Sequence, residues 1–121
     1  MDGIHLLGEW YDCPSELPEM TNAKALRERC LDAVRTAGLT IVGDRFHQFD
    51  PHGVTGAVIL AESHLAIHTW PEMGSVTIDV YVCNFTTDNT EKARRLFEAI
   101  ERSLKPARTR YQEIQRGGSH G

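Results

Sequence analysis

Four consecutive strand-like segments between residues 39 and 83 constrain the fold more than any other feature of the chain. Each is rich in β-branched and aromatic residues, which favour strands. The connections DPHG, Glu62-Ser63 and PEMG are too short to hold a crossover helix, so we expect neighbouring strands to pair antiparallel. The segments are LTIVGDRFHQF at 39–49, VTGAVILA at 54–61, HLAIHTW at 64–70 and SVTIDVYVC at 75–83.

The flanking segments add one strand at each end. IHLLGEW at 4–10 predicts a first strand, and DCPSELPE after it reads as a connection broken by proline. ARTRYQEIQ at 107–115 is the last candidate strand.

Two segments have helical spacing of apolar residues. The first begins at about Asn22 and stops at Gly38, and the second begins with a capping-box-like Asp88 and Glu91 and ends at Pro106. This order of elements predicts an α+β fold, a two-layer α/β sandwich in which two helices cover one face of an antiparallel sheet.

The second face of this sheet has no segment left to cover it. In 75–83 the alternation separates an apolar row from a mixed row. A mixed polar and aromatic face suits water or a second subunit, and we expect a homodimer whose sheets face each other. The apolar row is Val76, Ile78, Val80 and Val82, and the mixed row is Thr77, Asp79, Tyr81 and Cys83.

Composition favours one soluble domain over residues 1–116, with a flexible tail at 117–121. The chain has 121 residues, 40% of them apolar and 25% charged, and a formal net charge of -4. Without a basic cluster or a long apolar run, we expect neither nucleic acid nor a membrane as partner, and a cytoplasmic location. Three cysteines without a CxxC spacing signal neither a disulfide framework nor a zinc site.

The stretch LAESHLAIHTWPE at 60–72 places polar residues where the pattern predicts the edge of the core. The plainest interpretation is a polar turn at Ser63 and His64, with His68 hydrogen-bonded on the dimer face. A hydrolase nucleophile is disfavoured, since GxSxG is absent. A metal site at His52, His64 and His68 is also disfavoured, because along a strand the last two rings would lie roughly 13 Å apart.

Self-processing is the remaining chemical interpretation of Ser63. A serine hydroxyl in a strained turn attacks the carbonyl before it and moves the acyl group from nitrogen to oxygen. Elimination across the resulting ester then cuts the chain. This chemistry requires a nearby acid/base such as histidine and a donor for the developing oxyanion.

The run ESHLAIHTWPE, with PHGVTGAV upstream and IDVYVC downstream, closely resembles the short prokaryotic form of S-adenosylmethionine decarboxylase. HLLGEWYDC, TIVGDRFHQF and the two-helix layout match as well, so the resemblance extends to Arg116. That family is pyruvoyl-dependent and acts in polyamine and spermidine biosynthesis.

The resemblance implies that the proenzyme cuts itself between Glu62 and Ser63, giving chains of 62 and 59 residues. Ser63 would become a pyruvoyl group whose ketone forms a Schiff base with the amine of S-adenosylmethionine. Neither a metal nor pyridoxal phosphate (PLP) is then expected.

The resemblance also implies processing and catalytic roles. His68 would remove the α-proton of the serine, and Cys83 would protonate the carbanion left by decarboxylation. Thr55 occupies the position of a processing serine, so this chain departs from the family there while keeping the hydroxyl. His64 receives no chemical role beyond orienting the turn.

Substrate contacts are implied for three further residues. Phe49 would stack on the adenine, Glu72 would bind the ribose hydroxyls, and Trp70 would have a supporting role. In the family the dimer shares its active sites, with the pyruvoyl and Cys83 from one subunit. Phe49, Thr55, His68 and Glu72 would come from the other.

Two alternatives remain at this point. A pyruvoyl enzyme could decarboxylate arginine or ornithine, and a non-catalytic relative could act as a heterodimer partner. Phe49 and Glu72 favour the nucleoside substrate, because a linear amino acid offers neither adenine nor ribose. Retention of Ser63, His68 and Cys83 argues against a non-catalytic role.

Overall fold

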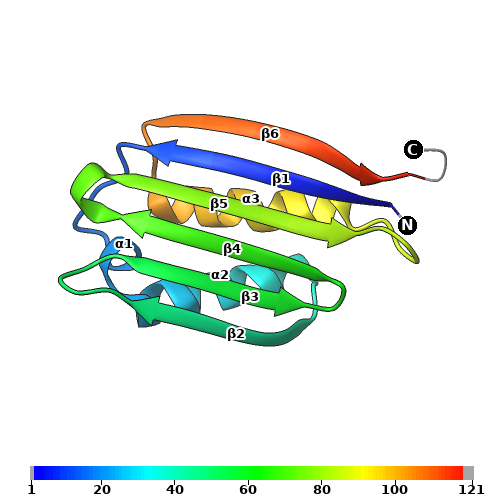
Figure 1. Ribbon diagram of the computed structural model, residues 1–121, viewed down its shortest axis with the longest axis horizontal. Coiled ribbons are helices and arrows are strands. Elements are labelled where there is room, and N and C mark those ends of the chain that lie inside the picture. The colour runs from blue at the N-terminus through cyan, green and yellow to red at the C-terminus, as the bar shows by residue number, and fades with distance from the viewer. Residues whose placement is uncertain (1, 119–121) are drawn as a thin grey trace.

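A computed structural model describes residues 2–118, and the chain forms one sheet with its helices on one side (Figure 1). The three terminal residues 119–121, most of the expected tail, lie outside the described residues. The elements in chain order are β1 (Asp2–Tyr11), α1 (Pro18–Thr21), α2 (Ala23–Ala37), β2 (Ile41–Gln48), β3 (Val54–Leu60), β4 (Ser63–Trp70), the 3-10 helix η1 (Pro71–Met73), β5 (Ser75–Cys83), α3 (Thr90–Leu104) and β6 (Arg108–Gly117).

The sheet has six strands in the order β2-β3-β4-β5-β1-β6, and every neighbouring pair is antiparallel. The α+β fold with an antiparallel sheet is therefore confirmed. Strands β2 to β5 follow one another as a meander. β1 lies between β5 and β6, so the N-terminal strand is inserted into the C-terminal half of the sheet.

The alternation predicted for β5 is confirmed. Val76, Ile78, Val80 and Val82 are at most 3% exposed and face the helices. They join inward-facing residues of β1, β3 and β4, such as Leu6, Val58 and Leu65, in one core. Burial of these apolar side chains is the main favourable term in folding the sheet onto the helices.

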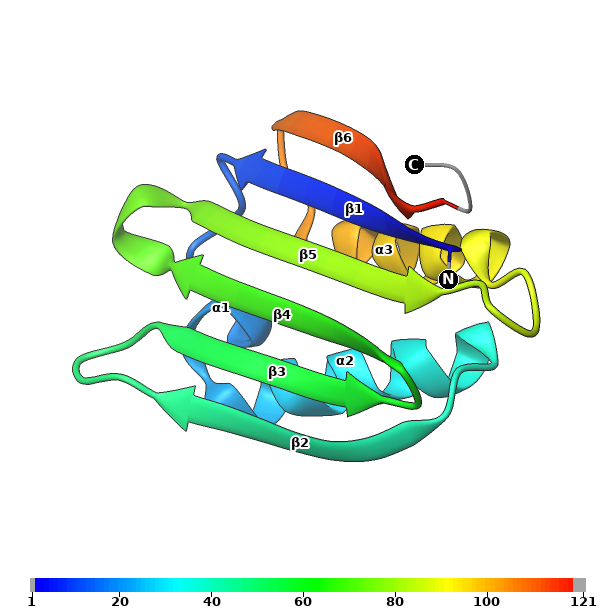
Figure 2. The same ribbon diagram turned by 45° about the vertical axis from the view of Figure 1, so that its right-hand side comes forward.

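The helices α2 and α3 lie side by side on one face of the sheet (Figures 1 and 2). Helix α2 begins where its sequence predicts, because the Asn22 side chain accepts a hydrogen bond from the Ala25 N–H at 2.9 Å. It ends at Gly38, which has a φ of 84° that glycine adopts without strain. Cys30 of α2 is fully buried in the core of the fold.

The expected start of α3 is wrong in detail. Asn89 is the N-cap and makes no side-chain cap, while Asp88 accepts a hydrogen bond from the Thr90 N–H. Glu91 pairs with Arg94 in the next turn and so does not close a capping box. The helix ends at Leu104, with Lys105 in a left-handed conformation before Pro106.

Two short helices were missing from the prediction. The connection read as proline-broken contains α1, and the turn PEMG contains η1. Met20 of α1 is fully buried, and its carbonyl accepts a hydrogen bond from the Thr69 hydroxyl at 2.8 Å. The short helix therefore fills the end of the core beneath β4.

No described helix crosses the other face of the sheet, which we name the open face (Figure 2). The same register that buries one row of each strand places the alternate row here. None of the described helices is long and apolar enough to cross a membrane. Side chains on the open face include His5, Leu7, Thr55, His64, His68, Thr77, Asp79 and Tyr81.

Candidate active site

The expected cleavage site lies in the turn between β3 and β4. Leu60 pairs with Ser63, so only Ala61 and Glu62 form the turn. Glu62 has a φ of 59°, in the left-handed region. For a residue with a side chain this conformation costs on the order of 1–2 kcal/mol. The peptide bond expected to break therefore follows a strained residue, as self-processing requires.

Ser63 and Cys83 are brought together from two strands. Ser63 begins β4 and Cys83 ends β5, and the Cys83 backbone N–H donates to the Ser63 Oγ at 3.1 Å. The Asn89 side chain donates to the Cys83 carbonyl at 2.9 Å and holds this end of β5. We name Glu62, Ser63 and Cys83 the serine end of the sheet.

Thr55 and His68 form a second pair, on the open face. They are cross-strand partners in β3 and β4, and the Thr55 Oγ1 lies 3.0 Å from the His68 Nδ1. His68 lies five positions after Ser63 along β4, and five positions of an extended strand span roughly 16 Å. The imidazole expected to act on Ser63 is thus out of reach of the serine in its own chain.

The expected substrate contacts lie with Thr55 and His68 at the opposite end of the sheet from the serine. Phe49 follows β2, Trp70 ends β4 and Glu72 lies in η1, which is at the left of Figure 1, whereas the β3–β4 turn is at the right. The Trp70 ring stacks near the His68 ring, with centroids 6.0 Å apart. We name these five residues the histidine end: Phe49, Thr55, His68, Trp70 and Glu72.

The side chains at the histidine end are open to a ligand. Phe49 is 48% exposed, and its ring meets the His47 ring edge-on at 4.6 Å between centroids. The Glu72 carboxylate lies 3.9 Å from the His52 Nε2, and 54% of its side chain is exposed. An exposed aromatic face and a carboxylate are available here for stacking and for accepting hydrogen bonds.

A separate hollow of about 610 Å³ lies on the part of the open face over β1, β5 and β6. It contains Asp79 but neither Ser63 nor any residue of the histidine end. This hollow therefore does not join the two ends. Its open-face lining is Leu7, Glu9, Thr77, Asp79, Arg110 and Gln112.

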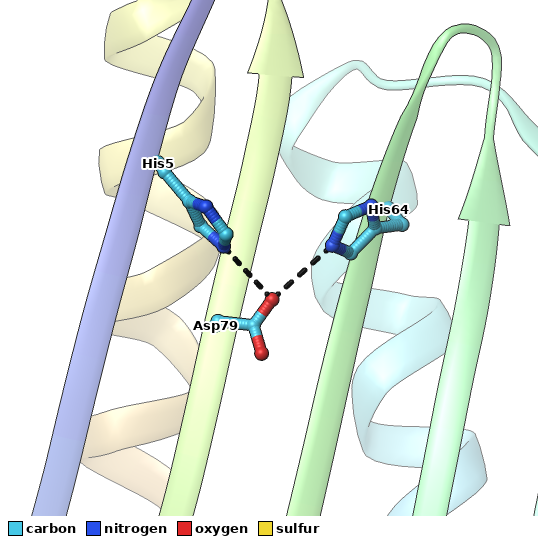
Figure 3. Close-up of side chains that lie close together, drawn as sticks. All are labelled: His5, His64 and Asp79. Atoms are coloured by element: carbon cyan, nitrogen blue, oxygen red, sulfur yellow. Dashed lines mark hydrogen bonds and ion pairs between the residues drawn. The ribbon is translucent and has the colours of Figure 1, made fainter. Parts of the chain in front are cut away.

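The metal hypothesis at His52, His64 and His68 is not supported, because each ring has a different partner. His52 lies by Glu72, His68 by Thr55, and His64 by Asp79. The structure instead gathers His5, His64 and Asp79 (Figure 3). Sequence reasoning missed this cluster, although alternation had already placed Asp79 on the open face.

Comparison with known proteins gives the fold and site a context. The model of the S-adenosylmethionine decarboxylase family matches residues 4–117. An S-adenosylmethionine decarboxylase proenzyme of Persephonella marina is 41% identical, and the match covers 95% of this chain and 82% of the relative. A proenzyme of the same name from Thermotoga petrophila is 38% identical, and the match covers 95% of this chain and 84% of the relative. A crystal structure of the adenosylmethionine decarboxylase from Aquifex aeolicus covers 96% of this chain and 91% of its own, with 38% identity and a TM-score of 0.86.

The chain belongs to the S-adenosylmethionine decarboxylase family. The resemblance read from ESHLAIHTWPE is thereby confirmed, and so is the enzyme class that it implies. The roles expected for individual residues stay predictions.

The three cysteines differ in their surroundings, which bears on the role expected of Cys83 in this family. Burial raises the pKa of the Cys30 thiol to about 12. Burial, together with the Asp12 carboxylate, raises the pKa of Cys13 to about 11. Both thiols therefore stay protonated and unreactive near neutral pH. Cys83 is 8% exposed, more than Cys13 at 3% or Cys30 at 0%, and it lies beside Ser63.

Alkylation of the native protein with iodoacetamide at mildly alkaline pH should therefore label Cys83 first. Peptide mapping by mass spectrometry reads the site, and unfolding in guanidinium is the control that should expose all three thiols. Labelling of Cys13 or Cys30 before Cys83 would contradict this ranking.

Proposed function

We propose that the chain is a self-cleaving, pyruvoyl-dependent S-adenosylmethionine decarboxylase that yields the aminopropyl donor for polyamine synthesis in the cytoplasm. The observation that carries the proposal is the serine end. A left-handed Glu62 precedes Ser63, and the Ser63 Oγ lies against the backbone of Cys83. This arrangement joins a strained scissile bond, a nucleophile and a proton donor in one place.

Processing follows from the chemistry of these groups. The Ser63 Oγ attacks the Glu62 carbonyl carbon; the peptide C–N bond breaks and an ester C–O bond forms. Loss of the Ser63 α-proton to a base then expels the Glu62 carboxylate. Water adds to the resulting enamine and ammonia leaves, which turns residue 63 into a pyruvoyl group. The strain at Glu62 favours the first step, because the bond being broken belongs to the strained turn.

In this proposal the base for the reaction comes from a second chain. His68 lies roughly 16 Å along β4 from Ser63 in its own chain. A two-fold axis through the open face would lay the histidine end of one subunit over the serine end of the other. We therefore propose a homodimer through this face, with each site built from both subunits.

The residues fit a pyruvoyl group at position 63, because Cys83 lies beside it and its backbone N–H already donates to an oxygen of residue 63. When formed, the group supplies a ketone that condenses with the substrate amine and withdraws the electrons released with carbon dioxide. Cys83 donates the proton that replaces the lost carboxylate. Phe49 and Trp70 stack on the nucleoside, and Glu72 accepts hydrogen bonds from the ribose diol.

The direct test uses the purified full chain. Intact-mass spectrometry should find two fragments split between residues 62 and 63, and Ser63→Ala should remain whole. Carbon dioxide should be released from carboxyl-labelled S-adenosylmethionine in preference to arginine or ornithine. An uncut wild-type chain would refute self-processing, and preferred release from arginine or ornithine would refute the substrate.

Replacing the Thr55 hydroxyl tests whether the contact between Thr55 and His68 is needed for self-cleavage. Thr55→Val removes the group 3.0 Å from His68 but keeps the shape of the side chain. We expect cleavage to slow by roughly five- to 150-fold, since loss of such a hydrogen bond costs roughly 1–3 kcal/mol. Thr55→Ser keeps the hydroxyl and should cleave within about threefold of wild type. A time course of fragment formation measures both, and normal cleavage of Thr55→Val would remove the role assigned to Thr55.

Mixed dimers test the shared site. Ser63→Ala and His68→Ala chains should each stay uncut when expressed alone. When the two are coexpressed, a mixed dimer has one complete site, formed by Ser63 of the His68→Ala chain and His68 of the Ser63→Ala chain. Fragments should then arise, and only from the His68→Ala chain, which a mass tag identifies. Failure of coexpression to restore cleavage, in dimers shown to be mixed, would contradict a site built from two subunits.

A further inference from the structure

Three side chains meet over the middle of the open face, outside both ends of the site. His5 on β1 and His64 on β4 lean from opposite sides toward Asp79 on β5 (Figure 3). The His5 Nε2 lies 3.0 Å and the His64 Nε2 3.2 Å from the same oxygen, Asp79 Oδ1. The order β4-β5-β1 in the sheet brings these strands together.

Arg116 on β6 fixes the roles of the His5 nitrogens. Its guanidinium lies 2.9 Å from the His5 Nδ1. Arginine carries only donors, so Nδ1 accepts and the proton of the ring is on Nε2. His5 therefore donates to Asp79, and the carboxylate also receives the N–H of His64. A chain of hydrogen bonds runs from Arg116 through His5 to Asp79, with His64 joining from the other side.

This polarity argues against a metal ion, although two histidines and a carboxylate are a known ligand set. The candidate ligand atoms lie within 4.8 Å of one another. A histidine bound to a metal through Nε2 carries its proton on Nδ1 and donates it to an acceptor. Here the Nδ1 of His5 faces the guanidinium of Arg116. With a metal on Nε2, the Nδ1–H of His5 would point at an N–H of Arg116, and the positive charges of the metal and the guanidinium would lie close together.

The position of the cluster indicates a role in holding strands β4 and β5 together near Ser63 and Cys83. His64 directly follows Ser63 on β4, and Asp79 lies four residues before Cys83 on β5. The contact between His64 and Asp79 therefore ties together the two strands whose ends carry Ser63 and Cys83. After cleavage at Glu62, Ser63 would be a free chain end, and His64 would be the first residue behind it.

We propose that Asp79, held by His5 and Arg116, is a positioning residue that fixes His64 and so keeps the Ser63 end of β4 against Cys83 during processing and turnover. This inference rests on the proposed function. In physical terms, one hydrogen bond from the His64 Nε2–H to the Asp79 carboxylate holds His64 in position.

The Asp79 carboxylate and the N–H of His64 can be removed separately. Asp79→Asn keeps the size of the side chain and loses its charge, and His64→Leu loses the donor. His64→Gln puts an amide N–H near the place of Nε2–H. Asp44→Asn is the matched control, because the Asp44 carboxylate also accepts two hydrogen bonds, both from Arg27. Asp44 lies on the edge strand β2, away from the strands β4, β5 and β1 that carry the cluster.

Cleavage of the full chain is followed in cell-free synthesis, and kcat and KM for S-adenosylmethionine are measured on the matured protein. We expect Asp79→Asn and His64→Leu to slow cleavage and lower kcat roughly tenfold with KM within about twofold, as for loss of a charge-assisted hydrogen bond. His64→Gln should stay within about threefold of wild type, and Asp44→Asn should match wild type. Thermal unfolding identifies any variant that is merely unfolded.

The remaining outcomes separate the explanations. Cleavage and kcat of Asp79→Asn and His64→Leu within twofold of wild type would overturn the inference, and so would a His64→Gln variant as impaired as His64→Leu. Stoichiometric zinc binding by wild type that Asp79→Asn abolishes would establish a metal site instead. An uncut wild-type chain would refute the proposed function itself, whereas a cut wild type with normal variants would refute only the role of Asp79.

Discussion

The pairing of β1 between β5 and β6 is the constraint on which the rest of the structure depends. A cut between residues 62 and 63 would leave β1, β2 and β3 in one fragment and β4, β5 and β6 in the other. In the order β2-β3-β4-β5-β1-β6, the two fragments meet at three strand pairs, β3 with β4, β5 with β1, and β1 with β6. Helix α2 of one fragment also packs on α3 of the other. The backbone can therefore be broken at Glu62 without separating the halves of the core.

The same topology explains why the strain sits where it does. The β3–β4 turn is at the end of the sheet and both of its residues are exposed, so a left-handed Glu62 there disturbs no buried side chain. Glycine would adopt this conformation at little cost, and with it the destabilisation of the scissile bond would be lost.

Sequence pattern predicted the four central strands well, because burial on one face imposes a period of two on β1, β3, β4 and β5. It failed for α1, since a helix of four residues that begins at Pro18 is too short to show a helical period. It also failed for the start of α3, where Asp88 and Asn89 are both plausible caps. The cluster at Asp79 depends on β1 pairing with β5, two segments some seventy residues apart. Alternation placed Asp79 on the open face, but only the strand order adds His5 and His64.

The expected site residues were identified from a family motif, and pattern alone did not assign their roles. The division into two ends, which the family resemblance implied, has a physical basis in the extended conformation of β4. Five residues would be little more than one turn of a helix, but in a strand they separate Ser63 from His68 by roughly 16 Å. The second subunit that we propose for each site is thus motivated by the extended conformation of β4.

The partners of the two histidines on β4 indicate different tasks for them. His68 faces the hydroxyl of Thr55, which can either donate or accept, so its ring can exchange a proton without losing the contact. His64 faces the carboxylate of Asp79, which only accepts, so its Nε2 must keep its proton for the contact to persist. Asp79 lies on the strand that ends at Cys83, so its contact with His64 joins β4 to β5 next to Ser63. On this ground His64 suits holding Ser63 in place, and the hydroxyl beside His68 suits a ring that gains and loses a proton.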